Sequence, residues 1–400
     1  MTPPSKKSDI DRRLYFILGL TPLVCLPGLY MGLFSIHFEP LVNVIIFGIA
    51  IFGAAFVISW AAEAAQIDIS ESLAVAILAL LAVMPEYAVD FVFTWKSAHD
   101  PSQAQYAIAN MTGSNRLLVG LGWPVVLFLY ILAKKKKKIV LDQSQRVEIF
   151  YLAMATLYSF TIPLKGSLTL IDTVILVFLF ALYARRVAQM EVEEPELVGP
   201  VKIVANMNTA GRRIVTVCMF LFSGAVIFFV AEGFAMSLVA MGRDFGINEF
   251  LLVQWLAPLA SESPEFIVAA TWALRGSAGS ALRVLISSKV NQWTLLVGTI
   301  PLVYAISGGA VRPFVLDSLQ NHELFLTAAQ SLFGLAVLVN LRLSRANGLL
   351  LFVLFTSQLI VEKIRMEVAA IYILLAIVYL IKHRRCLIPA ARTGLGLKKD

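Results

Sequence analysis

Apolar residues occur in long runs along the whole chain, separated by short polar segments. A helix needs about 20 residues to cross the hydrocarbon core of a bilayer, and fewer where the bilayer thins. The chain shows no ~10-residue segments of alternating apolar and polar residues, so a transmembrane β-barrel is not expected. Twelve runs predict transmembrane helices, over residues 14–34, 41–65, 72–95, 105–133, 147–164, 168–184, 213–241, 249–274, 282–307, 323–340, 347–361 and 367–382.

The composition agrees with a membrane protein. The set AVILMFWYC makes up 59% of the 400 residues, and DEKR only 15%. Soluble domains are about 45–50% apolar and about 25% charged. The excess of apolar residues excludes intrinsic disorder, a secreted disulfide scaffold and a nucleic-acid-binding domain. The three cysteines are far apart and form no CxxC pair, so no disulfide framework is expected.

The positive charges predict how the chain is oriented in the membrane. Of the 33 Lys and Arg residues, 25 lie on the cytoplasmic side if the N-terminus is placed there, and six lie outside. The remaining two, Arg116 and Lys289, fall within apolar segments. Because cytoplasmic segments are enriched in Lys and Arg, we expect both termini in the cytoplasm. We expect an integral protein of the plasma membrane, which in a bacterium is the inner membrane.

Two long stretches of the chain resemble each other. Each has a Pro-Glu pair inside an apolar helix and, in the next helix, an Asn seven residues before a Gly: Pro85-Glu86 with Asn115 and Gly122, then Pro264-Glu265 with Asn291 and Gly298. The third and eighth predicted helices are five crossings apart, so they run in opposite directions. Inverted repeats with helices broken at mid-membrane are typical of secondary transporters. We therefore predict an all-α polytopic membrane protein of two inverted repeats.

The repeat also predicts the division of the chain. The segment between the two halves is too short for a folded regulatory domain and is interpreted as a linker. The expected parts are an N-terminus with an extra leading helix (1–40), a first repeat (41–184), a cytoplasmic linker (185–212), a second repeat (213–362), and an extra final helix with a basic C-terminus (363–400).

Acidic residues inside the apolar segments carry the candidate chemistry. An ionised side chain at a helix centre costs roughly 2.5–3.5 kcal/mol, so six would cost about 15–20 kcal/mol without compensation. They must be protonated, paired or bound to cations. The six are Glu63, Glu86, Asp90, Glu232, Glu262 and Glu265.

Four of these acids form two pairs. Glu86 and Asp90 are four residues apart, and Glu262 and Glu265 are three apart, so each pair shares one helical face. Two such pairs on antiparallel helices, with amide oxygens nearby, predict an all-oxygen site. Oxygen ligands suit hard cations such as Ca²⁺ or Na⁺. The absence of sulfur and imidazole argues against copper, zinc or iron.

The Pro-Glu helices followed by Gly113-Ser114-Asn115 resemble the calcium/cation antiporter superfamily, the sodium/calcium exchangers. The resemblance covers about residues 60–125 and 230–300. It implies a ten-helix exchanger core, flanked here by one extra helix on each side. It implies a transporter, and not an enzyme, that moves Ca²⁺ or another cation against Na⁺ or H⁺ by alternating access. The partners are inorganic cations and the lipid bilayer, a monomer suffices, and no cofactor is expected.

The resemblance also implies roles for single residues. Glu86 and Glu265 are the central ligands, and Asp90, Glu262, Asn115, Asn291, Ser261 and Ser287 complete the shell. Some positions depart from the family pattern: Glu262 replaces a hydroxyl residue, Lys289 begins the triplet that ends at Asn291, and Arg116 follows Asn115. These departures leave a second reading open, a monovalent cation/proton exchanger with Lys289 as internal counter-ion. An intramembrane enzyme is disfavoured, because the chain has no HExxH, GxSxG or GxGD motif.

Overall fold

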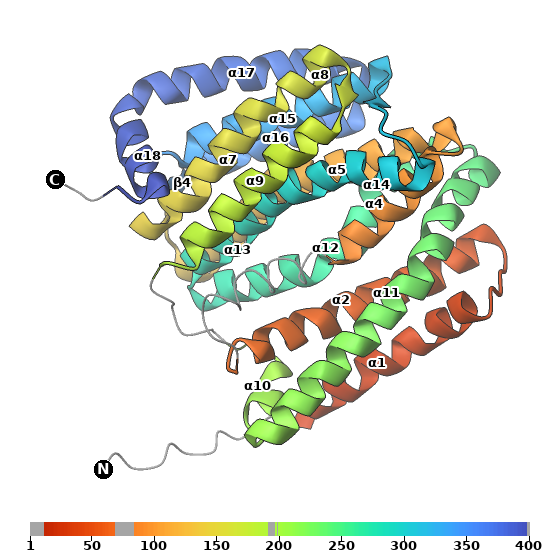
Figure 1. Cartoon of the computed structure of the whole chain (residues 1–400). Coiled ribbons are helices and arrows are strands. Elements are labelled where there is room, and N and C mark those ends of the chain that lie inside the picture. Colours follow the sequence, from red (N-terminus) through yellow and green to blue (C-terminus); the bar gives the residue numbers. More distant parts are fainter. Residues whose placement is uncertain (1–11, 69–83, 191–196, 198, 398–400) are drawn as a thin grey trace, which may run out of the picture.

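The computed structural model describes residues 12–68, 84–190, 197 and 199–397. This part of the chain is built of helices joined by short segments and four short strands (Figure 1). Most of the described residues of each predicted transmembrane segment are helical. Residues 72–83 of the third segment lie outside the described part, and the sixth segment, predicted from residue 168, begins as a helix only at Leu170.

Three helices form a group of their own along one side of the molecule (Figure 1). They are α1 (Arg12–Leu33), α2 (Pro40–Ala65) and α11 (Thr209–Phe245), and each packs against the other two. Helix α11 begins after Asn208, whose side chain accepts a hydrogen bond from the Gly211 N–H at 2.7 Å. It ends at Gly246, which has a left-handed φ of 64°. Such caps satisfy backbone groups that a helix end leaves free.

An ion pair connects one end of α2 to α11. The Arg212 guanidinium donates to both carboxylate oxygens of Asp68, at 2.6 and 2.8 Å. These hydrogen bonds hold the pKa of the Asp68 carboxyl below its ordinary value, because they favour its charged form.

The remaining helices form the larger group. From the first half of the chain it takes α4 (Met84–Ser97), α5 (Ala104–Leu117), α6 (Trp123–Lys134), α7 (Arg146–Ser159), α8 (Thr161–Lys165) and α9 (Leu170–Val187). From the second half it takes α12 (Glu249–Arg275), α13 (Ala278–Asn291), α14 (Val297–Gly308), α15 (Ser318–Leu338), α16 (Arg345–Ile360) and α17 (Arg365–Lys382). Short 3₁₀ turns cover Pro101–Gln103, Gln143–Gln145, Glu362–Ile364 and Arg384–Cys386.

Two single turns of π-helix stand at equivalent places in the two repeats. They are η2 (Leu118–Gly122), which joins α5 to α6, and η4 (Gln292–Leu296), which joins α13 to α14. Each follows the repeated Asn within three residues. Single π turns inside helices occur frequently at functional sites. The repeat in the sequence is therefore also a repeat in the backbone, which the apolar pattern alone does not predict.

The four strands pair across the two halves. β1 (Lys138–Val140) pairs antiparallel with β4 (Arg342–Ser344), and β2 (Ser167–Leu168) pairs antiparallel with β3 (Phe314–Val315). β1 and β3 each follow the helix with the π turn, whereas β2 precedes α9 and β4 precedes α16. The first strand of each half thus pairs with the second strand of the other half.

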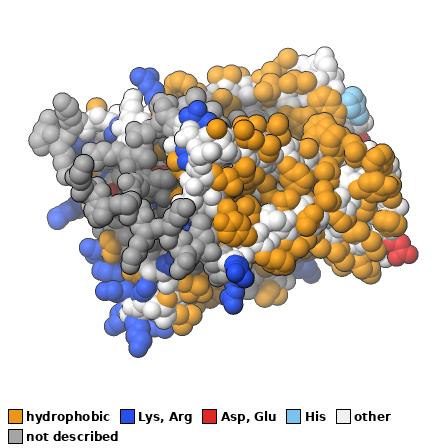
Figure 2. Space-filling model, turned by 90° about the horizontal axis from the view of Figure 1, so that it is seen from below, with side chains coloured by type: hydrophobic (Ala, Val, Ile, Leu, Met, Phe, Trp, Pro, Cys, Tyr) orange, Lys and Arg blue, Asp and Glu red, His pale blue; other side chains and the backbone are white. Residues whose placement is uncertain are grey.

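The surface carries many exposed apolar side chains. Viewed from below, hydrophobic side chains cover much of the molecule and Lys and Arg gather toward one end (Figure 2). Phe16 and Leu23 of α1 and Leu221 and Phe228 of α11 are exposed. By length and composition, six helical stretches of the described residues can cross a membrane: Arg12–Leu33, Pro40–Ala65, Pro101–Lys134, Gln143–Lys165, Thr209–Phe245 and Glu362–Lys382. Helix α12, which carries predicted site residues, is not one of them, because buried polar residues lower its hydropathy.

The structure differs from the expected elements in three respects. Helix α12 continues from Glu249 to Arg275 through Pro258 and Pro264, so it is not broken at mid-membrane as the helices of many secondary transporters are. Proline still removes one hydrogen-bond donor from the helix, which leaves the carbonyl four residues earlier without its usual partner. The linker contains α10 (Val201–Ala205), and the basic C-terminal segment forms α18 (Leu387–Leu395), which packs on α7.

Candidate cation site

The two Pro-Glu motifs meet inside the larger group of helices. Glu86 lies in the first turn of α4 and is only 1% exposed. Glu262 and Glu265 lie on α12, and both are within electrostatic range of the Glu86 carboxylate. Gly113 allows the close packing that brings α5 against α12, because a Cβ atom there would lie 1.7 Å from the Gln254 carbonyl oxygen.

Two residues that the sequence analysis missed hold the α12 carboxylates. The Gln292 amide donates to Glu262 Oε1 at 3.0 Å, and the Ser288 hydroxyl donates to Glu265 Oε2 at 2.6 Å. Gln292 is the first residue of the π turn η4. Both residues lie within three positions of Asn291, which the repeat had already marked. That proximity is the feature of the sequence from which they could have been predicted.

The Asp90 carboxylate lies one turn beyond Glu86 on α4. Its Oδ1 accepts a hydrogen bond of 2.7 Å from the Asn110 amide of α5. Its Oδ2 is buried and has no hydrogen-bond partner among the described residues, and the same holds for both oxygens of Glu86 and for Glu262 Oε2. Buried polar atoms normally have partners, so these oxygens mark a place for a cation or for protons.

The two repeated asparagines have different neighbours. Lys289 is fully buried and donates to the Asn115 side-chain oxygen at 2.8 Å and to its backbone oxygen at 3.1 Å. The Lys289 ammonium also lies 4.5 Å from the centre of the Trp293 ring. Asn291 accepts a hydrogen bond from the Tyr87 hydroxyl at 3.3 Å. The Asn115 carbonyl oxygen is therefore already occupied by a positive group of the chain itself.

The two predicted serines face backbone or other helices. Ser261 is buried beside Glu86, and its hydroxyl donates to the Ala257 carbonyl at 3.2 Å. Ser287 makes a hydrogen bond of 2.7 Å with the Tyr183 hydroxyl of α9. Glu265 is thus contacted by Ser288 and not by its neighbour Ser287. In the part of the chain described, no three His, Cys, Asp or Glu side chains are grouped to hold a metal ion by themselves.

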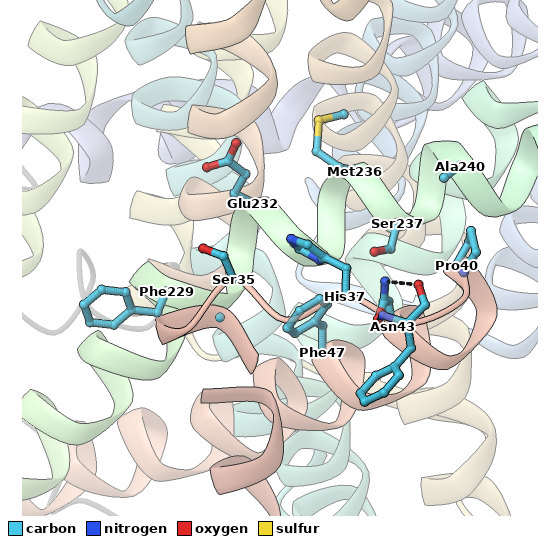
Figure 3. Close-up of a pocket in the computed structure, with 13 residues that line it drawn as sticks. Ser35, His37, Pro40, Asn43, Phe47, Phe229, Glu232, Met236, Ser237 and Ala240 are labelled. Carbon is cyan, nitrogen blue, oxygen red and sulfur yellow. Dashed lines mark hydrogen bonds between the residues drawn. The ribbon is translucent and has the colours of Figure 1, made fainter. Parts of the chain in front are cut away.

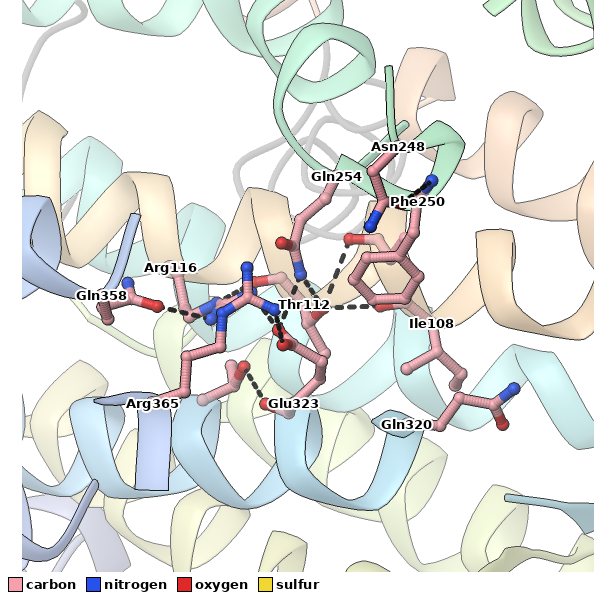
Figure 4. A network of polar contacts seen from close by, with 12 residues as sticks. Ile108, Thr112, Arg116, Asn248, Phe250, Gln254, Gln320, Glu323, Gln358 and Arg365 are labelled. Carbon is pink, nitrogen blue, oxygen red and sulfur yellow. Dashed lines mark hydrogen bonds and ion pairs between the residues drawn. The ribbon is translucent and has the colours of Figure 1, made fainter. Parts of the chain in front are cut away.

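A second buried polar cluster borders the site (Figure 4). Arg116, the residue after Asn115, forms an ion pair with Glu323 of α15, which also pairs with Arg365 of α17. Gln254 of α12 donates to Glu323 at 2.7 Å, and Arg116 donates to Gln358 of α16 at 2.7 Å. The cluster links α5 and α12 to the last three helices of the larger group. Arg116 is therefore a structural ion-pair partner, whereas Lys289 faces the site.

A family model agrees with these observations. The model of the sodium/calcium exchanger protein family matches residues 39–187 and 215–362. The chain belongs to this family. The predicted family is therefore confirmed, and with it a cation antiporter, which is a transporter and not an enzyme. The bounds of the two halves predicted from the repeat stay a prediction.

Solved structures of the sodium/calcium exchanger family share the fold. The H⁺/Ca²⁺ exchanger CAX is 43% identical, with 96% of this chain and 98% of that chain covered and a TM-score of 0.93. Native YfkE is 13% identical, with 85% and 98% covered and a TM-score of 0.64. The sodium-calcium exchanger NCX_Mj is 16% identical, with 85% and 99% covered and a TM-score of 0.51. No curated protein matches the chain.

Proposed function

We propose that this antiporter exchanges Ca²⁺ for H⁺ at the buried carboxylates of α4 and α12. The observation that carries the proposal is the set of four acids, the buried Glu86, Asp90 and Glu262 and the half-buried Glu265, with Lys289 as the ammonium among them. If all ionise, the acids outweigh the lysine, and a divalent cation or protons must supply the difference. The similarity to the H⁺/Ca²⁺ exchanger CAX, at 43% identity over almost the whole chain, supports this ion pair.

Each predicted site residue has a part in the proposal. Glu86 and Glu265 bind the cation directly. The shell is completed by Asp90, Glu262, Asn291 and Ser261, together with water, since Ca²⁺ takes 6–8 oxygen ligands. Asn115 contributes by holding Lys289, and Ser287 by its hydrogen bond to Tyr183. Antiport follows from the charge. Empty carboxylates are too costly in an occluded, low-dielectric site, so the protein changes sides only when it is loaded with Ca²⁺ or protonated.

We further propose twelve membrane crossings in two halves of inverted topology, with both termini in the cytoplasm. The strand pairing supports inversion, because the first strand of each half pairs with the second strand of the other. If equivalent connections lay at the same membrane face, β1 and β3 would be neighbours. The excess of Lys and Arg in the N-terminal, linker and C-terminal segments supports cytoplasmic termini. The membrane proposed is a bacterial inner membrane.

One contact favours a second candidate, a monovalent cation/proton exchanger. The Lys289 ammonium binds Asn115 where a transported ion would otherwise find an oxygen ligand. The Lys289 ammonium neutralises part of the negative charge of the carboxylates. A transported ion then needs less positive charge to balance the site, which favours Na⁺ over Ca²⁺.

Purified protein in liposomes distinguishes the two candidates. Ca²⁺, Na⁺ and K⁺ fluxes are measured with a pH gradient imposed in either direction. For Ca²⁺/H⁺ exchange, a pH gradient drives Ca²⁺ uphill, and Glu86→Gln or Glu265→Gln abolishes that flux while the protein still inserts. Lys289→Ala then keeps Ca²⁺ transport but alters its dependence on pH. Proton-driven Na⁺ flux without Ca²⁺ flux would establish the second candidate instead.

A further inference from the structure

A groove beside the carboxylates leads toward the surface of the molecule. It has a volume of about 950 Å³ and lies between α4, α11 and α14. Most of its lining is apolar, for example Phe91 of α4 and Phe228 of α11. Asp90 and Thr94 supply polar groups deep in the groove, and Lys96 and Glu232 supply charged groups at its outer end.

The deep polar groups have unused oxygens. Asp90 and Thr94 are 2% and 1% exposed, and they lie one turn apart on the same face of α4. Neither Asp90 Oδ2 nor Thr94 Oγ1 has a hydrogen-bond partner among the described residues. Asn110, behind Asp90, turns its amide nitrogen to Asp90 Oδ1, and its own Oδ1 also has no partner there. A carboxylate accepts only, so this contact fixes the orientation of the amide.

The two oxygens that line the groove, Asp90 Oδ2 and Thr94 Oγ1, suit a cation better than an uncharged ligand. A carboxylate oxygen and a hydroxyl are hard ligands of the kind that Ca²⁺ takes. The groove is wide enough for a cation that keeps several of its waters. A single carboxylate binds a cation weakly. Weak binding suits a site on a transport pathway, because the ion must be able to leave it again.

The outer end of the groove carries an ion pair between the two groups of helices. Lys96 of α4 and Glu232 of α11 are 2.7 Å apart, and the Glu232 side chain is 64% exposed. Glu232 also lines a second cavity, of about 510 Å³, with Ser35 and His37 of the segment that joins α1 to α2 (Figure 3). The exposed Lys96–Glu232 pair therefore marks the mouth of the groove.

The second repeat has no such arrangement. The residue four after Glu265 is Ala269, and the equivalent of Thr94 is Ala273; both are buried. The oxygen ligands of the groove thus belong to one half of the protein. In an inverted repeat, equivalent features of the two halves face opposite sides of the membrane. A groove that only one half possesses therefore opens to one side only.

We propose that Asp90 and Thr94, with Asn110 orienting the Asp90 carboxylate, form an accessory cation subsite between the Lys96–Glu232 mouth and the central carboxylates. The inference rests on the proposed function, and it assigns Asp90 to the pathway as well as to the central shell. Four residues of helix rise about 6 Å, so an ion at Asp90 is one step from Glu86. The transported Ca²⁺ occupies this subsite when it enters or leaves on the side of Lys96, which the Lys and Arg distribution makes the outer side.

Sided transport kinetics test the subsite. Radioactive Ca²⁺ uptake is measured in right-side-out and in everted vesicles for wild type, Asp90→Asn and Thr94→Val. Losing the charged contact raises the KM for outer Ca²⁺ about tenfold, and losing the hydroxyl raises it about fivefold. The KM for cytoplasmic Ca²⁺ stays unchanged in Thr94→Val, and in Asp90→Asn it rises less than the outer KM because Asp90 also belongs to the central shell. The control Asp100→Asn removes an exposed charge near the same end of α4 and leaves both KM values unchanged.

The possible outcomes separate the subsite from the proposed function. Glu86→Gln abolishes flux from both sides if the central site is as proposed. Wild-type protein that moves no Ca²⁺ would overturn both proposals. If wild type transports and Glu86→Gln does not, an unchanged outer KM in Asp90→Asn and Thr94→Val, or an equal rise on both sides in Thr94→Val, overturns the subsite alone. Valine has nearly the same shape as threonine, so Thr94→Val should still fold and insert. It therefore tests the subsite even if Asp90→Asn fails to insert.

Discussion

Glu323 balances two buried guanidinium groups, and Glu323→Gln would leave both without a counter-charge. Glu323 and Arg116 are fully buried, and Arg365 is only 6% exposed. Removing one partner of a buried ion pair costs about 3–5 kcal/mol, because the remaining charge stays buried. That corresponds to roughly two to four orders of magnitude in the unfolding equilibrium. It is a large share of the about 5–15 kcal/mol by which a typical domain is stable.

The effect can be measured as resistance to unfolding in detergent. Unfolding of wild type and Glu323→Gln is followed against temperature and denaturant, with Glu362→Gln as the matched control. Glu362 is exposed, and a surface change of this kind stays within about 0.5 kcal/mol. Equal stability of Glu323→Gln and Glu362→Gln would refute the reasoning, since it would mean that the Arg116–Glu323–Arg365 cluster is hydrated or already neutral.

Two further predictions concern the ends of the helices. Because Arg212 lowers the pKa of Asp68, this pair stabilises the protein above the ordinary Asp value of 3.8, and its contribution is lost as pH falls through the folded pKa. As the pH falls below about 4, the ordinary Asp pKa, thermal stability should therefore fall more steeply in wild type than in Asp68→Asn. Parallel curves for the two proteins would contradict this. Cys introduced at Gln143 and at Thr393 should react with an impermeant thiol reagent only from the cytoplasmic face, and labelling of either from outside would overturn the proposed topology.

The local pattern of the sequence determines where the helices lie and where the two repeats are. Apolar runs and Pro-Glu pairs are one-dimensional signals, and the cost of a charge in lipid singles out Glu86 and Glu262 without any structure. The family followed from the same residues, since Pro85-Glu86 and Asn115 recur at matching places in the second half.

Which partners those residues take depends on tertiary structure. Ser287 and Ser288 are adjacent, but neighbouring positions on a helix point about 100° apart. Ser288 therefore contacts Glu265, whereas Ser287 contacts Tyr183. The π turn at Gln292 changes the helical phase again and turns that amide to Glu262. A pattern of residue types does not resolve such rotations.

The pairing of the two buried cations was also beyond the sequence. Arg116 and Glu323 are 207 residues apart, and Lys289 and Asn115 are 174 apart. Their charges alone permitted either cation to face the carboxylates. Only the packing of α5 between α12 and α15 directs Arg116 away from the site and places Lys289 within it, because each buried charge must find its partner where the helices actually meet.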